Sequence, residues 1–132
     1  TRFIMLKRLT LGPPATNPAA RILRAHAPTL PQAPRAAAED IIQFLAHDEN
    51  NPGWFRGIDA SGIEGYFPRD WFMIDATHHR ATALRDYLAT ELKVSPGDTV
   101  YPIAAVGPWL QVITVDWQTG WIPQACLPAP AN

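Results

Sequence analysis

Short runs of alternating hydrophobic and polar residues fill this chain, and each run ends at turn-forming residues. The stretches 40–48, DIIQFLAHD, and 98–106, DTVYPIAAV, combine β-branched and aromatic residues with partial alternation, which is typical of half-buried strands. The same pattern predicts strands in GWFRGIDA, IEGYFP, WLQVITVD and TGWIP. Polar turns at 59–62 and 116–120 are expected to join these strands as hairpins. We therefore expect an all-β protein.

The content of proline and glycine supports this expectation. The 132 residues include 14 prolines and 8 glycines, which disfavour long helices and favour short segments separated by turns. A chain of this length accommodates one ordinary domain or two small ones.

An internal repeat favours two small domains. Four pairs of short motifs recur in the same order with offsets of 61, 58, 55 and 55 residues. The offset shrinks only where loops are expected, so we interpret the chain as two copies of one fold. The pairs are LRAH at 23–26 with LRDY at 84–87, AEDII at 38–42 with PGDTV at 96–100, GWFRG at 53–57 with PWLQV at 108–112, and EGYFPRDWF at 64–72 with TGWIPQACL at 119–127.

The second copy resembles the Src homology 3 (SH3) domain. Its sequence, ALRDY…ELKVSPGDTV…W…GWIPQACL, is similar to the family pattern of ALYDY, EL, GD, a tryptophan and GxxP before an aromatic residue. The resemblance implies two small five-stranded SH3-like barrels in tandem, at 20–76 and 80–129. The basic segment 1–19 is expected to add a strand. The short link DATHHR, 75–80, is expected to restrict motion between the barrels.

The resemblance also implies a peptide-binding groove in each barrel. A polyproline II peptide has no internal hydrogen bonds, so aromatic ridges receive its proline rings and an indole N–H reaches its free carbonyls. Asp48 and Glu49 precede Trp54 closely; they would pair with a basic ligand residue or serve as solvated turn acids. The groove residues carried over are His26, Trp54, Pro68 and Trp71 in the first copy and Tyr87, Trp109 and Pro123 in the second.

Three residues depart from the family pattern. Arg24 and Arg85 replace the first tyrosine of ALYDY in the two copies, and Cys126 stands where the second groove needs an aromatic residue. Trp71 is the counterpart of Cys126 in the first copy. We therefore expect the first copy to be the stronger peptide site.

Charge and cysteine content indicate which classes of partner and which cellular compartment to expect. Residues 1–38 carry six basic residues and no acidic ones, whereas residues 39–132 carry five basic and twelve acidic ones. The acidic body repels phosphates, so no nucleic-acid partner is expected. No apolar run is long enough for a membrane span, and the single Cys126 forms no internal disulfide, so a cytoplasmic location is expected.

These features favour a non-enzymatic adaptor or scaffold that binds proline-rich or extended peptides. No catalytic constellation, cofactor motif or metal cluster is apparent in the sequence, and the adjacent His78 and His79 point apart on an extended chain. The alternative is a structural or autoinhibitory clamp whose degenerate grooves pack on each other or on another domain. A nucleic-acid-binding or cell-wall-binding barrel is a third, weaker alternative.

Overall fold

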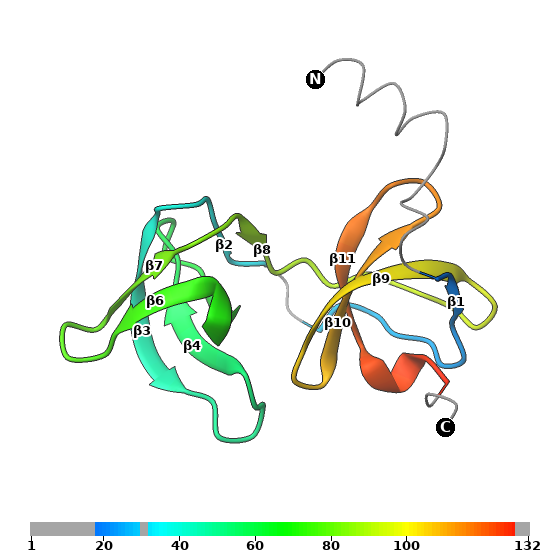
Figure 1. Ribbon diagram of the computed structural model, residues 1–132, viewed down its shortest axis with the longest axis horizontal. Helices are drawn as coiled ribbons and strands as arrows, with labels where there is room; N and C mark the ends of the chain where they lie inside the picture. The colour runs from blue at the N-terminus through cyan, green and yellow to red at the C-terminus, as the bar shows by residue number, and fades with distance from the viewer. Residues whose placement is uncertain (1–17, 30–31, 129–132) are drawn as a thin grey trace, which may run out of the picture. The chain divides into compact units, whose positions relative to one another are not determined.

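The computed structural model describes residues 18–29 and 32–128, and these residues form strands, turns and two short 3₁₀ segments (Figure 1). No α-helix occurs in these ranges, so the all-β prediction is confirmed. The predicted added strand at 1–19 falls almost wholly outside the described residues. The 3₁₀ segments are η1 (Arg69–Trp71) and η2 (Gln124–Cys126).

The described chain divides into two compact units. Unit 1 contains residues 18–27, 92–105 and 109–128, and unit 2 contains the described residues of 28–91 together with 106–108. This division differs from the expected boundaries at 20–76 and 80–129. Residues 20–27 lie with the C-terminal half of the sequence, and residues 80–91 lie with the N-terminal half.

Unit 2 is built on an antiparallel five-stranded sheet in the order β5-β4-β3-β7-β6. A separate two-stranded sheet joins β2 and β8. The strands are β2 (Arg35–Ala36), β3 (Ile41–His47), β4 (Trp54–Ile58), β5 (Glu64–Pro68), β6 (Phe72–Asp75), β7 (Arg80–Ala83) and β8 (Tyr87–Leu88).

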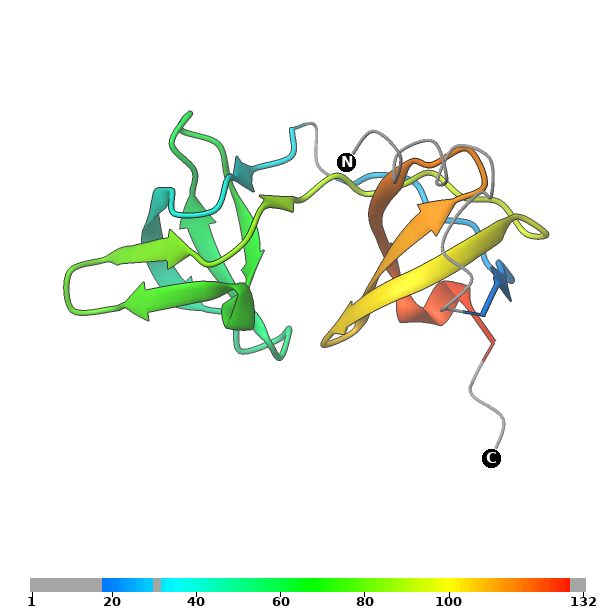
Figure 2. The same ribbon diagram turned by 45° about the horizontal axis from the view of Figure 1, so that its top comes forward.

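Residues 75–80 were expected to link two barrels, but they close a hairpin inside unit 2. Asp75 at the end of β6 pairs with Arg80 at the start of β7 (Figures 1 and 2). His78 Nδ1 lies 2.8 Å and Arg80 Nε 3.5 Å from the Asp75 carboxylate. A connection this short favours antiparallel pairing of the two strands that it joins. β7 therefore pairs with β6 in the same unit.

Unit 1 contains a four-stranded sheet in the order β1-β9-β10-β11. The strands are β1 (Ala20–Arg21), β9 (Thr99–Val106), β10 (Trp109–Thr114) and β11 (Thr119–Pro123). The last residue of β9, Val106, is grouped with unit 2. The sheets of both units have open ends, so the expected closed barrels are not formed. The strands β1, β2 and β8 have only two residues each. Pro34 precedes β2 directly, and proline cannot donate a ladder hydrogen bond.

Each unit has its own apolar core. In unit 2, Phe55 stacks on Phe67 with ring centroids 5.4 Å apart, and Phe72 lies edge-on to Phe55 at 5.4 Å. In unit 1, aliphatic side chains dominate a buried cluster of Ile22, Leu92, Val94, Val100, Val112, Ile122 and Cys126. Ile22 belongs to this cluster although it lies far from the other members in sequence. Burial of Ile22 therefore ties residues 20–27 to the C-terminal half.

Candidate functional site

Unit 2 gathers four of the predicted groove residues into one cluster. Trp54 opens β4 and lies opposite Pro68 at the end of β5, and Trp71 follows in η1. The ring of Tyr87 lies 6.4 Å from that of Trp54 and 5.8 Å from that of Trp71, in an edge-on arrangement with Trp71. We call Trp54, Pro68, Trp71 and Tyr87 the unit 2 cluster.

Tyr87 was expected in the second copy, beside Trp109, and its place in the unit 2 cluster is a correction. The tight β6–β7 hairpin keeps β7, and the β8 strand that follows it, in unit 2. The Tyr87 hydroxyl donates a hydrogen bond to the backbone carbonyl of Tyr66, at 2.8 Å. Burial, with a smaller contribution from the charge of Glu91, raises the pKa of Tyr87 far above its usual range. Tyr87 is therefore a neutral, fixed donor.

The rings of the unit 2 cluster are largely covered. Trp54 and Trp71 are 4% and 8% exposed. The indole N–H of Trp54 donates to the Val106 carbonyl at 2.9 Å, and the guanidinium carbon of Arg85 lies 3.8 Å from the Trp71 ring centroid. In the groove that the resemblance implies, a peptide carbonyl and a proline ring would need these same indole and ring surfaces. Burial thus argues against the expectation that the first copy is the stronger site.

Unit 1 gathers His26, Trp109 and Pro123, which we call the unit 1 cluster. Trp109 at the start of β10 lies opposite Pro123 at the end of β11. The His26 ring lies edge-on to the Trp109 ring, with centroids 5.8 Å apart at 79°. All three residues are half-buried, so part of each side chain faces solvent.

His26 was expected in the first copy, and its contact with Trp109 is the second correction. Backbone hydrogen bonds between His26 and Val94 run in both directions, at 3.0 and 2.9 Å. Because β1 also pairs with β9, the whole stretch from β1 to His26 lies in unit 1. Sequence reasoning placed Trp109 and Pro123 correctly relative to each other but assigned the wrong third member.

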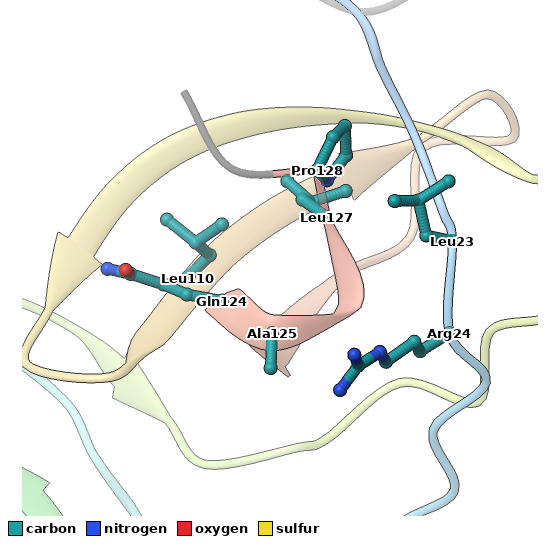
Figure 3. Close-up of a pocket in the computed structure, with 7 residues that line it drawn as sticks. All are labelled: Leu23, Arg24, Leu110, Gln124, Ala125, Leu127 and Pro128. Atoms are coloured by element: carbon teal, nitrogen blue, oxygen red, sulfur yellow. The ribbon is translucent and has the colours of Figure 1, made fainter. Parts of the chain in front are cut away.

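Unit 1 also has an apolar surface pocket that the sequence analysis missed. Figure 3 shows Leu23 and Arg24 on one side of this pocket and Leu110 on the opposite side. Its volume is about 640 Å³, and among the described residues that line it Arg24 is the only charged one. The replacement of a family tyrosine by Arg24 was the one sequence signal at this place. The described residues that line it are Leu23, Arg24, Leu110, Gln124, Ala125, Leu127 and Pro128.

Asp48 organises the turn that precedes Trp54. Its carboxylate accepts hydrogen bonds from the Asn51 side-chain amide at 2.8 Å and from the Asn50 backbone N–H at 2.9 Å. The Asn51 hydrogen bond holds the pKa of Asp48 below its usual range. These bonds favour the turn-acid interpretation for Asp48. Glu49, in the same turn, is exposed.

Comparison of the chain with protein-family models, curated proteins and solved structures finds no match in any of the three. Within residues 18–29 and 32–128, no group of three or more histidine, cysteine, aspartate or glutamate side chains is arranged to hold a metal ion. In the same residues, no helix has the length and apolarity needed to cross a membrane.

Proposed function

We propose that the two units are SH3-like repeats and that the chain is a non-enzymatic protein-interaction module for proline-rich or extended peptides. The half-buried unit 1 cluster carries this proposal. Trp109, His26 and Pro123 form a ridge of ring surfaces that remains open to solvent. A ridge of this kind suits the threefold spacing of a polyproline II helix.

In this proposal, one proline ring of the ligand packs between Trp109 and Pro123. The His26 imidazole, edge-on to Trp109, limits the groove at one end and offers a nitrogen for a ligand hydrogen bond. The described residues of unit 1 carry Arg21, Arg24 and Lys93 against Asp98 and Asp116, so their charges nearly balance and ring contacts, not net charge, select the ligand. The reducing setting expected from the single cysteine suits a cytoplasmic adaptor.

The second candidate function is a structural or autoinhibitory clamp, and contacts in unit 2 favour it for that unit. The Val106 carbonyl on Trp54 and the Arg85 guanidinium on Trp71 satisfy the unit 2 cluster from within the chain. Unit 2 would then stabilise the chain while unit 1 binds the ligand.

A peptide array tests the proposal, with the intact chain screened against synthetic PxxP peptides and the tightest ones then titrated. Trp109→Ala should weaken binding about 30-fold, since aromatic groove residues contribute about 2 kcal/mol. Tyr66→Ala is the matched control, because Tyr66 is an aromatic residue on β5 of unit 2 that is 42% exposed. Failure of every peptide to bind, or an equal loss in Tyr66→Ala, would leave the clamp as the better account.

A further inference from the structure

The strand registers of the two units match at the offsets of the sequence repeat. In unit 1, Ala20 and Arg21 pair with Val100 and Thr99. The same register recurs in unit 2. Adding 61 to the numbers of Ala20 and Arg21, and subtracting 58 from those of Val100 and Thr99, gives the residues that face each other there. These are Ala81 opposite Ile42 and Thr82 opposite Ile41. The two units are therefore copies of one strand arrangement.

Hydrogen bonds repeat with the same offsets. Backbone bonds of segment 20–27 in unit 1 have counterparts made by segment 81–88 in unit 2. The matched N–H to carbonyl bonds are Ile22 to Asp98 with Ala83 to Asp40, both 2.8 Å, and Leu23 to Cys126 at 2.7 Å with Leu84 to Trp71 at 2.8 Å.

The aromatic clusters repeat as well. His26 forms a β-bridge with Val94, and its ring contacts that of Trp109. In the same way, Tyr87 pairs with Ala36 through the backbone, and its ring contacts that of Trp54. Segments 20–27 and 81–88 thus have the same structural role. Each performs that role in the unit whose other strands come from the opposite half of the sequence.

We propose that the two repeats have exchanged these first segments, and that the chain also reaches a second arrangement. In this arrangement, which we call the second closure, each segment packs with the other strands of its own half of the sequence. In the second closure, segment 20–27 pairs with β3 and segment 81–88 pairs with β9. The exchange explains why the sequence reads as a tandem repeat while the units combine both halves.

Core volume explains why the exchanged closure is favoured. Ile22, 1% exposed, fills the core of unit 1, whereas its counterpart Ala83, 2% exposed, fits beside the phenylalanines of unit 2. Returning the segments would place alanine in the unit 1 core and leave a cavity. It would also force isoleucine into the tighter site in unit 2. The second closure is therefore the minor state.

The turn at 76–79 is the hinge of the exchange. It holds His79 at φ 54°, a left-handed conformation that is uncommon for residues other than glycine. The turn is also held by exposed contacts of Asp75 with His78 and Arg80, and by backbone bonds of His79 with Ala76 at 3.2 Å and with Phe44 at 2.9 Å. Opening this hairpin releases β7 from β6, and nothing in the proposal requires β4, β5, β10 or β11 to separate.

The second closure would change the candidate binding sites. Tyr87 would move beside Trp109, and His26 would move beside Trp54 and Trp71. The closure would replace an imidazole by a phenol beside Trp109, and so would alter the hydrogen-bonding chemistry of the unit 1 cluster. This consequence rests on the proposed function, but the exchange itself does not.

Cysteine pairs in the full chain, in a Cys126→Ser background, test the exchange directly. Facing Cα atoms in antiparallel strands lie about 4.5–5.5 Å apart, within the range that a disulfide spans. Ile41→Cys with Thr82→Cys reports the observed closure. Ile41→Cys with Arg21→Cys reports the second closure, because Arg21 is the counterpart of Thr82. Ile41→Cys with Met73→Cys is the control, since these residues lie two strands apart, about 10 Å.

Dilute native protein is oxidised, and disulfides in the monomer are mapped by mass spectrometry. The 41–82 link should form rapidly, and the 21–41 link should form in monomers more slowly but above the 41–73 control. Combining Ile22→Ala with Ala83→Ile should speed the 21–41 link roughly tenfold or more, because the volume preference is reversed.

Two further pairs repeat the test from unit 1, so the test can still be decided if one variant folds poorly. Thr99→Cys with Arg21→Cys reports the observed closure, and Thr99→Cys with Thr82→Cys reports the second closure. Links 21–41 and 82–99 in monomers support the second closure. Their absence in both backgrounds, or their formation only between molecules, overturns it.

Discussion

The hydroxyl of Tyr87 donates a hydrogen bond of 2.8 Å to the backbone carbonyl of Tyr66, although the two residues belong to different copies of the sequence repeat. This bond fixes the Tyr87 ring between Trp54 and Trp71. It also makes the unit 2 cluster a product of both halves of the chain.

Tyr87→Phe should destabilise the protein by about 1–2 kcal/mol, since it removes a buried hydrogen bond and leaves the Tyr66 carbonyl without this donor. The raised pKa of Tyr87 sets a pH dependence. The contribution of the neutral Tyr87 side chain to the free energy of unfolding is fully present below the unfolded-state pKa near 10. This contribution is lost as the pH rises above that value, by about 1.4 kcal/mol per pH unit. Urea unfolding between pH 7 and 11 measures both effects. An unchanged alkaline slope in Tyr87→Phe would show that Tyr87 ionises freely in the fold.

Arg85→Ala should lower stability by about 0.5–1 kcal/mol, because the guanidinium stacks on the Trp71 ring at 3.8 Å. Arg24→Ala is the matched control, since Arg24 is the counterpart of Arg85 in the repeat and Cys126 stands in the place of Trp71. Chemical unfolding followed by tryptophan fluorescence compares the two variants. Equal losses would mean that Arg85 acts through something other than the indole ring.

Asp75→Asn should lower the melting temperature at pH 7, because the Asp75 carboxylate restrains the β6–β7 turn. The hydrogen bond from His78 holds the pKa of Asp75 below its usual range. Its contribution is therefore present above the unfolded pKa near 4 and is lost as pH falls below that value. Thermal scans from pH 7 to pH 3 should show the gap between wild type and variant closing. Asp70→Asn, at an exposed aspartate in η1, should track wild type throughout.

Ile22→Ala should destabilise unit 1 by about 2–5 kcal/mol through a core cavity, whereas Leu23→Ala, at a side chain 57% exposed, should change stability by less than about 0.5 kcal/mol. Hydrogen exchange should show faster opening of β9 and β11 in Ile22→Ala. Faster exchange confined to β3 and β4 would instead place segment 20–27 with the N-terminal half.

Local sequence pattern predicted the strands and the hairpins well. The turn expected at 59–62 forms because the Asp59 carboxylate accepts hydrogen bonds from the N–H groups of Ser61 and Ile63. The resemblance grouped Trp54 with Pro68 and Trp109 with Pro123, and the members of each pair do lie opposite each other. These features depend on residues close together in the chain.

Partner choice was not predictable from local pattern, because the two copies present the same strand signals. Whether segment 20–27 pairs with β3 or with β9 depends on the turn at 76–79 and on the volumes of Ile22 and Ala83. The solvent exposure of the two clusters could not be predicted from the sequence either. Sequence indicates an arginine at position 85 but not that its guanidinium lies on the Trp71 ring.

The most direct test of the proposed function is a nuclear magnetic resonance titration of the intact ¹⁵N-labelled chain with a proline-rich peptide from the array. The five tryptophans give separate indole N–H signals. The account predicts a saturable shift of the Trp109 signal, while the Trp54 signal, bonded to the Val106 carbonyl, stays in place. A titration in which the Trp54 signal moves and the Trp109 signal does not would contradict the account.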